Sequence, residues 1–312
     1  MTTVYLKPHK EESLLRFHPW VFSGAIRSIQ LDADYPHAQP QEGEVVQVRD
    51  SNGNILGVGH YQIGSIAVRI LAFGVGELPH DFWQERICAA YEVRRSLGLI
   101  TSLPDPQSPI SNPQYPTNNT YRLVHGEGDF LPGLIVDIYA DTAVIQAHSI
   151  GMHYHREEIA KAIVQAVPQV DKVYYKSDDT LPHKAPIQGE RVGYLIGAEK
   201  ADFNGDFWAK ENGLDFRIDW LRGQKTGFFI DQRDNRALLE HYAQGKEVKT
   251  AISSYPALAL LPWVALAVHT ISQLKVLITI LTYILRIATE RLLISILLFL
   301  AMTIPILSAC PR

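Results

Sequence analysis

The last fifth of this 312-residue chain lacks glycine and almost lacks acidic residues. Residues 250–312 have no glycine, where a segment of this length should carry about four or five, and Glu290 is their only acid. Loops that let the backbone approach a nucleotide cofactor depend on glycine, and an acid usually binds the ribose hydroxyls. These absences exclude a glycine-loop cofactor site within residues 250–312.

Cysteine is also scarce, because the chain has only Cys88 and Cys310. Two cysteines cannot form a metal site alone, and they give no pairing pattern typical of a secreted protein. Met1 is followed by polar and basic residues instead of a long apolar core, so we expect no signal peptide. These features predict a cytoplasmic protein.

Charge is unevenly distributed along the chain. The formal net charge is −4 at pH 7, from 29 Lys and Arg against 33 Asp and Glu. Residues 250–312 carry four basic residues and one acid, so residues 1–249 carry 25 basic and 32 acidic groups, a net of −7. An acidic body does not by itself indicate nucleic-acid binding, and any RNA contact must depend on a local basic patch.

Residues 1–75 have the pattern of a small β-rich domain. Short apolar runs alternate with polar residues in HPWVFSGAI (18–26) and in GEVVQVRDSNGNILGVGHY (43–61). The segment SIAVRIL (65–71) adds one more predicted strand. Alternation of this kind is typical of strands that bury one face.

Residues 76–197 have the pattern of a compact α/β domain. A loose apolar stripe that includes Val93 and Leu97 predicts a helix over 80–99. The Pro-, Ser- and Asn-rich stretch 102–120 predicts a loop. Strands are expected at 121–128, 131–140, 142–148 and 172–177, and a second helix at 152–167.

Residues 198–249 begin with a predicted hairpin over 201–220. The segment GQKTGFFIDQRDNR (223–236) then predicts a tight turn, a short apolar strand and the polar start of a helix. That helix is expected from about Asp231 to Tyr242.

The tail after Thr250 also has a membrane interpretation. LLISILLFLAMTIPIL (292–307) is a run of 16 uncharged residues, whereas a membrane span needs about 20 apolar residues. Pro305 falls within the run, and charged residues interrupt the apolar sequence before it. A membrane anchor is therefore the weaker interpretation, and no membrane partner is expected.

Four segments resemble one known family. LKPHKEESLLRFHPWVFSGAI (6–26) and GHYQIGSIAVRIL (59–71) resemble the opening and closing parts of a PUA domain, a small pseudo-barrel that docks structured RNA. YRLVHGEGDFLPGLIVDIY (121–139) and GLDFRIDWLRGQKTGFFIDQRDNR (213–236) resemble the central domain and the start of the methyltransferase domain. The family is that of the class I S-adenosylmethionine (SAM)-dependent 23S rRNA methyltransferases that modify cytosine C5. Four ordered matches are far more specific than any one motif.

The resemblance implies a mixed α+β and α/β fold. Its parts are a PUA-like RNA-binding β-barrel at 1–75, a central α/β domain at 76–197, the N-terminal part of a Rossmann-like SAM-methyltransferase domain at 198–249, and an atypical apolar tail at 250–312.

The chain departs from the family where the cofactor loop should follow. The corresponding stretch is AISSYPALALLPWVALAVHTISQ (251–273), which has neither glycine nor acid. The family's Asp-Pro-Pro loop and nucleophilic cysteine are also absent, since Cys310 in SACPR matches no such motif. A frameshift near codon 249 would explain both the change in composition and the missing motifs. No catalytic residue is therefore assigned.

Five residues are candidates for the SAM site that the resemblance implies: Lys225, Thr226, Phe229, Gln232 and Asn235. Gln232 and Asn235 are three residues apart and share a helix face. The alternatives are a turn at Lys225–Gly227 and an ordinary polar helix start capped by Asp231.

The candidate RNA-binding residues are basic. Trp20 and Phe22 could add a stacking surface, although we expect these two rings to belong to the barrel core. Arg233 could neutralise a phosphate from the predicted helix. The full set is Lys7, Lys10, Arg16, His18 and Arg233.

Other polar residues have more ordinary interpretations. His148, His153 and His155 lack a Cys or acid that would complete a metal site, so surface histidines are expected and no metal. Glu127 and Asp129 are expected to be structural, because two nearby carboxylates are weak evidence for acid–base catalysis.

The function implied by the resemblance is SAM-dependent methylation of C5 of a cytosine in 23S rRNA. In that chemistry a thiolate adds to C6, C5 takes the methyl group, and a base removes the C5 proton. This chain keeps RNA-docking elements but lacks the residues for covalent catalysis, so one alternative is a non-catalytic RNA-binding remnant. A membrane-anchored RNA-binding module is a second alternative. The expected partner is 23S rRNA, and a homodimer is left open.

Overall fold

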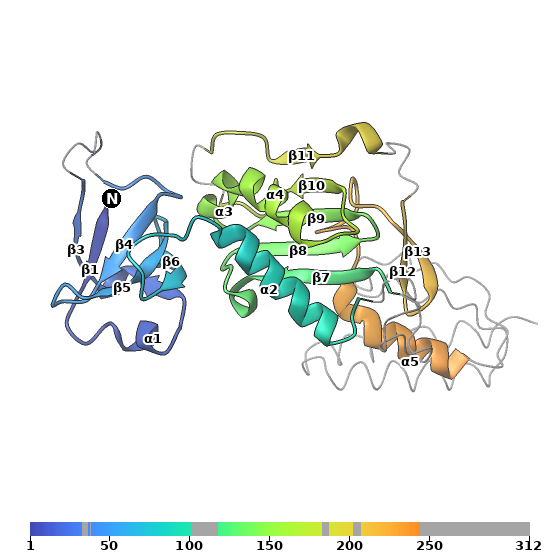
Figure 1. Ribbon diagram of the computed structural model, residues 1–312, viewed down its shortest axis with the longest axis horizontal. Helices are drawn as coiled ribbons and strands as arrows, with labels where there is room; N and C mark the ends of the chain where they lie inside the picture. The colour runs from blue at the N-terminus through green and yellow to red at the C-terminus, as the bar shows by residue number, and fades with distance from the viewer. Residues whose placement is uncertain (33–36, 38, 101–117, 183–186, 202–206, 244–312) are drawn as a thin grey trace, which may run out of the picture. The chain divides into compact units, whose positions relative to one another are not determined.

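The computed structural model describes residues 1–32, 37, 39–100, 118–182, 187–201 and 207–243 (Figure 1). The chain divides into two units, Met1–Asp231 and Gln232–Arg312. In the second unit the described part is the helix α5 (Arg233–Ala243) and the residue before it. The predicted tail at 250–312 lies outside the described residues.

The first unit begins with a six-stranded sheet. Val4, Leu6, Val46 and Val48 alternate along two neighbouring parallel strands and are fully buried, as expected for strands with one face on a core. The prediction of a β-rich N-terminal domain is therefore confirmed. The sheet has the order β2-β6-β5-β4-β1-β3, with β1 (Thr3–Leu6), β2 (Trp20–Phe22), β3 (Ile26–Gln30), β4 (Val45–Arg49), β5 (Ile55–Tyr61) and β6 (Ile66–Phe73), and a short helix α1 (Glu12–Leu15) follows β1.

A second, five-stranded sheet carries helices on one face (Figure 1). Leu134, Val136 and Ile138 alternate along one strand and enter the same apolar core as the helices. The mixed fold predicted from the sequence is confirmed. The strand order is β11-β10-β9-β8-β7, with β7 (Thr120–His125), β8 (Leu134–Tyr139), β9 (Thr142–Ala147), β10 (Lys172–Lys176) and β11 (Val192–Ile196), and the helices are α2 (Phe82–Ser96), α3 (Ile150–Tyr154) and α4 (Arg156–Ala166).

Two helix predictions need correction. The helix expected at 152–167 is divided, because His155 leaves helical geometry (φ −93°, ψ 12°) between α3 and α4. Val93 and Leu97 are 48% and 66% exposed, so the buried stripe of α2 is narrower than the sequence indicated. The buried side of α2 is formed by Phe82, Ile87 and Ala90.

The two sheets of the first unit meet at His60 of β5. Its imidazole is 2% exposed and stacks on His155, with ring centroids 5.0 Å apart and planes 14° apart. The backbone of Gly151 lies against the same ring, and a Cβ at that position would come within 2.1 Å of the His60 Cγ. Position 151 of α3 therefore accepts only glycine while His60 occupies this place.

The hairpin predicted at 201–220 is present as β12 (Phe207–Glu211) and β13 (Leu214–Ile218). The short apolar strand predicted after the turn is not formed. Lys225 (φ 52°) and Gly227 (φ 106°) turn the backbone sharply, and a 3-10 turn at Ile230–Gln232 begins only two residues after Phe228. The two phenylalanines therefore pack as side chains of a loop, not as a strand.

The described helices include none that is both long and apolar enough to cross a membrane. The predicted membrane run at 292–307 lies outside the described residues. The predicted domain boundaries at residues 75, 197 and 249 remain predictions.

Candidate functional site

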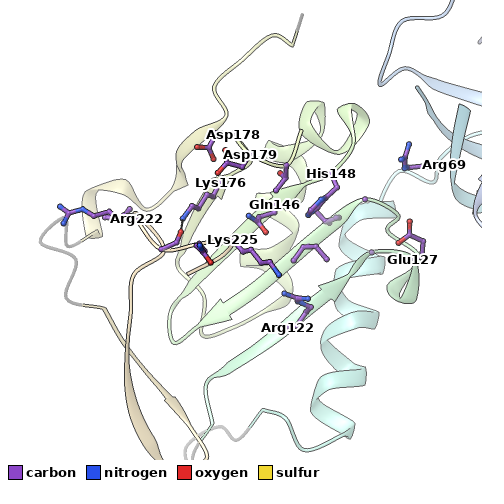
Figure 2. Close-up of a pocket in the computed structure, with 18 residues that line it drawn as sticks. Arg69, Arg122, Glu127, Gln146, His148, Lys176, Asp178, Asp179, Arg222 and Lys225 are labelled. Carbon is purple, nitrogen blue, oxygen red and sulfur yellow. Dashed lines mark hydrogen bonds between the residues drawn. The ribbon is translucent and has the colours of Figure 1, made fainter. Parts of the chain in front are cut away.

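The candidate site is a groove on the face of the five-stranded sheet that the helices do not cover. Val136, Ile145 and Ala147 belong to the helix-side core, whereas Ile135 and Gln146 are paired across β8 and β9 and line the groove. The groove has a volume of about 760 Å³. We call it the sheet groove (Figure 2).

Basic side chains outnumber acidic ones along the sheet groove. Three carboxylates, Glu127, Asp178 and Asp179, face five cationic side chains on a chain whose residues 1–249 are net acidic. Such a local excess favours an anionic ligand. The cationic residues are Arg69, Arg122, Lys176, Arg222 and Lys225.

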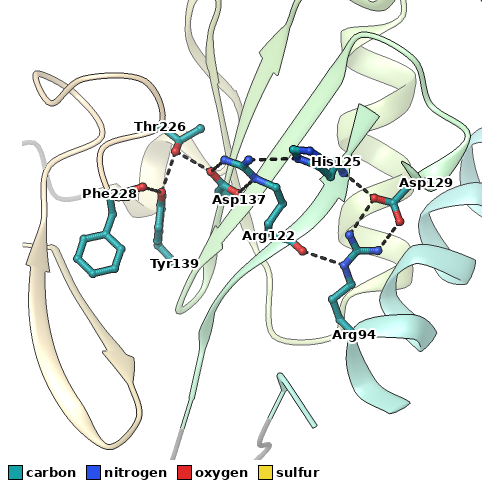
Figure 3. Close-up of polar contacts among 8 residues, drawn as sticks. All are labelled: Arg94, Arg122, His125, Asp129, Asp137, Tyr139, Thr226 and Phe228. Atoms are coloured by element: carbon teal, nitrogen blue, oxygen red, sulfur yellow. Dashed lines mark hydrogen bonds and ion pairs between the residues drawn. The ribbon is translucent and has the colours of Figure 1, made fainter. Parts of the chain in front are cut away.

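One buried carboxylate holds two walls of the groove together (Figure 3). Asp137 of β8 is fully buried and accepts two hydrogen bonds from Arg122, at 2.8 Å from Nε and 3.0 Å from Nη2. The Thr226 hydroxyl donates to the same carboxylate at 2.7 Å. A buried charge requires such partners, so Asp137 fixes both Arg122 and the loop that contains Thr226.

Tyr139 makes a second connection to this loop. Its hydroxyl lies 2.9 Å from the Thr226 Oγ1 and 3.3 Å from the carbonyl oxygen of Phe228, to which it can donate. The ring stacks on Trp220 at 6.0 Å. Burial, with Asp137 adding to it, raises the pKa of Tyr139 well above its ordinary value, so the phenol remains neutral.

The loop between Asp219 and Phe228 is closed by its own backbone and by Lys176. Asp219 accepts hydrogen bonds from the amides of Leu221 (3.1 Å) and Arg222 (2.9 Å). The Lys176 ammonium donates to the carbonyl oxygens of Trp220, at 2.8 Å, and of Gly223. Burial lowers the pKa of Lys176. This ammonium therefore holds the loop by hydrogen bonds and also lines the groove.

A second ion pair fixes the turn after β7. Arg94 of α2 forms two hydrogen bonds with Asp129, and its Nε donates to the Arg122 carbonyl at 2.9 Å. Asp129 also accepts from the His125 amide at 2.6 Å. Glu127 accepts from the Trp20 indole at 2.9 Å. The structural roles expected for Glu127 and Asp129 are thus observed.

The five candidate cofactor residues are not all brought together. Lys225 lines the groove, with its ammonium 5.3 Å from the Phe229 ring centre. Thr226 is 1% exposed, and its hydroxyl is used by Asp137 and Tyr139. In the second unit, the Asn235 amide donates to the Gln232 Oε1 at 2.7 Å. Their roles in cofactor binding remain predictions.

The N-terminal candidates lie near β2, away from the groove lining. Lys7, Lys10, Arg16 and His18 are exposed, and the Lys7 ammonium donates to the Gly24 carbonyl at 2.8 Å. Arg233 is half-buried in the second unit. All five remain predicted RNA contacts.

The expectation that Trp20 and Phe22 belong to the barrel core is wrong. Phe22 is 49% exposed, and Trp20 is only partly buried. Both alternate with the buried Val21 on β2, so they share its outer face, where their rings meet edge to face at 6.3 Å. The core position in this strand is the valine between them.

Of the histidines expected at the surface, His153 is buried and His155 is partly buried. His153 is fully buried, with its ring nitrogens 2.7 Å from the Tyr175 hydroxyl and 2.8 Å from the Gln188 carbonyl. His155 stacks on His60. His148 lines the groove, and desolvation followed by the Arg122 charge lowers its pKa. Among the described residues, no three His, Cys, Asp or Glu side chains gather as metal ligands would.

Three groove residues on the sheet were not predicted from the sequence, namely Arg122, Gln146 and Lys176. Each is a polar residue within a strand that is otherwise largely apolar or aromatic: TYRLVH, TAVIQA and KVYYK. An isolated polar residue in a buried strand was the signal that could have found them. Their proximity depends on strand order, which the sequence pattern does not specify.

Comparison with known proteins first identifies one domain and the fold. A PUA-like domain model matches residues 4–73, the six-stranded sheet. A protein from Streptococcus mutans described as a SAM-dependent methyltransferase has the same fold over 77% of this chain and 54% of its own, with 20% identity and a TM-score of 0.55. A methyltransferase solved in complex with SAH matches 77% of this chain and 53% of its own, with 20% identity and a TM-score of 0.56.

Sequence relatives then specify the family. The protein named ribosomal RNA large subunit methyltransferase I is 35% identical in Tolumonas auensis over 249 residues, which are 79% of this chain and 56% of that protein. Its counterpart in Alteromonas mediterranea is 33% identical over 252 residues, 80% of this chain and 56% of the relative. The chain is therefore homologous to the large-subunit rRNA methyltransferases, and the resemblance predicted from the sequence is confirmed. The chain spans just over half of the length of these relatives.

Proposed function

We propose that this chain binds ribosomal RNA and contributes the RNA-holding part of a large-subunit rRNA methyltransferase. The observation that carries the proposal is the sheet groove, where five cations gather on an otherwise acidic chain. Arg122 is held in place by Asp137, so its guanidinium is oriented before a ligand arrives. The names of the relatives supply the class of RNA.

The finer assignment is methyl transfer from SAM to C5 of a cytosine in 23S rRNA, in the cytoplasm. It is supported by the four segments that resemble the C5-cytosine family, including GQKTGFFIDQRDNR at 223–236. The domain organisation proposed for this activity has boundaries after residues 75, 197 and 249.

The described residues do not by themselves fit a SAM site. Thr226 has its hydroxyl engaged with Asp137 and Tyr139, and the side chains of Gln232 and Asn235 bond to each other. Of the five candidates only Lys225 lines the groove.

RNA binding without methyl transfer is the second candidate function. The observation that favours it is the sequence of residues 250–312, which has no glycine and a single acid. A cofactor loop of the usual kind cannot be built from that composition. The groove would still hold RNA in such a protein.

Two measurements on the full chain test these functions. Filter binding with fragments of 23S rRNA should show saturable binding that weakens as salt increases. Replacing Arg222 and Lys225 together by glutamine should weaken it, because both are exposed cations of the groove wall. Absence of RNA binding would contradict both functions. Transfer of labelled methyl groups from SAM to the RNA distinguishes the enzyme from the binding protein.

A further inference from the structure

Gln146 of β9 is the most unusual side chain of the sheet groove. It is 6% exposed and lines the groove (Figure 2), yet its carboxamide has no hydrogen-bond partner among the described residues. The nitrogen and oxygen of this amide remain accessible to solvent in the groove. A ligand bound there can therefore form hydrogen bonds with both atoms.

The surroundings of Gln146 suit a flat ligand that also carries negative charge. Ile135 lies directly opposite on β8 and gives an apolar floor. His148 keeps an exposed ring at the end of the strand, and desolvation followed by the Arg122 charge lowers its pKa, which favours the neutral ring. Arg122 and Lys225 supply positive charge in the same groove. An apolar floor and an imidazole ring beside cations suit an unpaired nucleotide.

The carboxamide itself distinguishes a base from a phosphate. It presents a donor and an acceptor side by side, which matches the Watson–Crick edge of a nucleobase. A phosphate offers acceptors only, so it would leave the Gln146 oxygen without a donor. A base in a duplex has this edge occupied, so only an unpaired base can use it.

We propose that Gln146 reads the hydrogen-bonding edge of an unpaired nucleobase of single-stranded RNA bound in the sheet groove. The inference rests on the proposed function in one respect, namely that RNA is the ligand. It adds a specificity-determining residue to that function.

Fluorescence anisotropy with labelled ten-nucleotide rC, rU and rA homopolymers tests the inference on the full chain. The wild-type protein should prefer one base. Gln146→Met keeps the length of the side chain and removes both hydrogen bonds, so it should reduce that preference roughly tenfold. The dependence of binding on salt should stay unchanged, because no charge is removed.

Two further variants serve as matched controls. Gln146→Glu keeps the shape but replaces the amide donor by an acceptor, so it should lose the preference as well. Arg222→Gln removes an exposed groove cation and should weaken all three oligomers equally, with a smaller salt slope. Near-ultraviolet circular dichroism and thermal midpoints check that each variant is folded.

The possible outcomes separate the inference from the proposed function. If folded Gln146→Met keeps the wild-type preference, the inference is wrong while RNA binding stands. Equal weakening of all oligomers by Gln146→Met, or a wild-type protein with no base preference, also overturns it. Failure of the wild-type protein to bind any RNA overturns both.

Discussion

Single buried charges hold the described part of this chain in its functional arrangement, and Asp137 is the clearest example. Its carboxylate accepts hydrogen bonds from Arg122 and Thr226 while fully excluded from water. This arrangement stabilises the fold because the buried carboxylate is hydrogen-bonded by both partners. Removal of either partner leaves a buried polar group unsatisfied.

Asp137→Ala should destabilise the first unit by about 3–5 kcal/mol, since the Arg122 charge would lose its only carboxylate partner among the described residues. Urea unfolding followed by tryptophan fluorescence measures the loss. Asp178→Ala is a matched control on the groove wall and should change stability by less than about 0.5 kcal/mol. Equal effects of the two substitutions would show that the Asp137 network is not stabilising.

His60 should make the free energy of unfolding decrease as the pH falls. Burial, then His155 and Arg69, lower its pKa from 6.5 to about 3, so the ring is neutral in the folded chain. The unfolded chain takes up a proton below pH 6.5 and the folded chain does not. The contribution to stability is therefore complete above pH 6.5 and is lost as the pH falls from 6.5 towards 3, by at most about 1.4 kcal/mol per unit.

Unfolding free energies at pH 7.5, 6 and 5 test this dependence. His60→Phe keeps a flat ring and removes the titration, so the variant should lose less stability on acidification than the wild type. The difference between the two proteins is the relevant quantity, because burial also lowers the pKa of His153 and of His155. Parallel pH profiles would exclude His60 as a source of the dependence.

At the scale of elements, the segment from the end of β1 to β2 combines exposed basic residues with exposed aromatic rings. Removal of Lys7, Lys10 and Arg16 together should weaken binding to structured rRNA fragments and lower the salt slope by about one for each phosphate that is no longer neutralised. Filter binding at several salt concentrations measures both. A folded triple variant with unchanged affinity and slope would remove this segment from the RNA-binding surface.

Elements with strong periodicity were predictable from the sequence, and those set by distant contacts were not. The strands β8 and β9 follow their patterns closely, and the helix α2 follows its pattern at Phe82, Ile87 and Ala90. The strand β11 was not predicted, and its place is set by pairing with β10. Phe22 was assigned to the core because the pattern of β2 shows alternation but not which face is inside. The turn at Lys225–Gly227 was predicted, whereas the groove beside it depends on strand order.

At the scale of the whole molecule, the sequence after residue 249 determines whether methyl transfer accompanies RNA binding. We expect no useful affinity for SAM, because residues 250–312 have no glycine and one acid. Isothermal titration calorimetry with the purified full chain measures this. Saturable binding at micromolar cofactor would show that another part of the chain replaces the expected pocket.

The junction between the two sheets also constrains how this protein can change over time. Because the His60 ring occupies the space of a Gly151 Cβ, neither position can vary alone without a clash or a void. Gly151→Ala should be strongly harmful beside His60 but tolerated beside His60→Ala, so the two positions should drift as a pair. Substitutions at positions 60 and 151 should therefore be correlated among sequences that evolve from this chain, even though 91 positions separate the two residues.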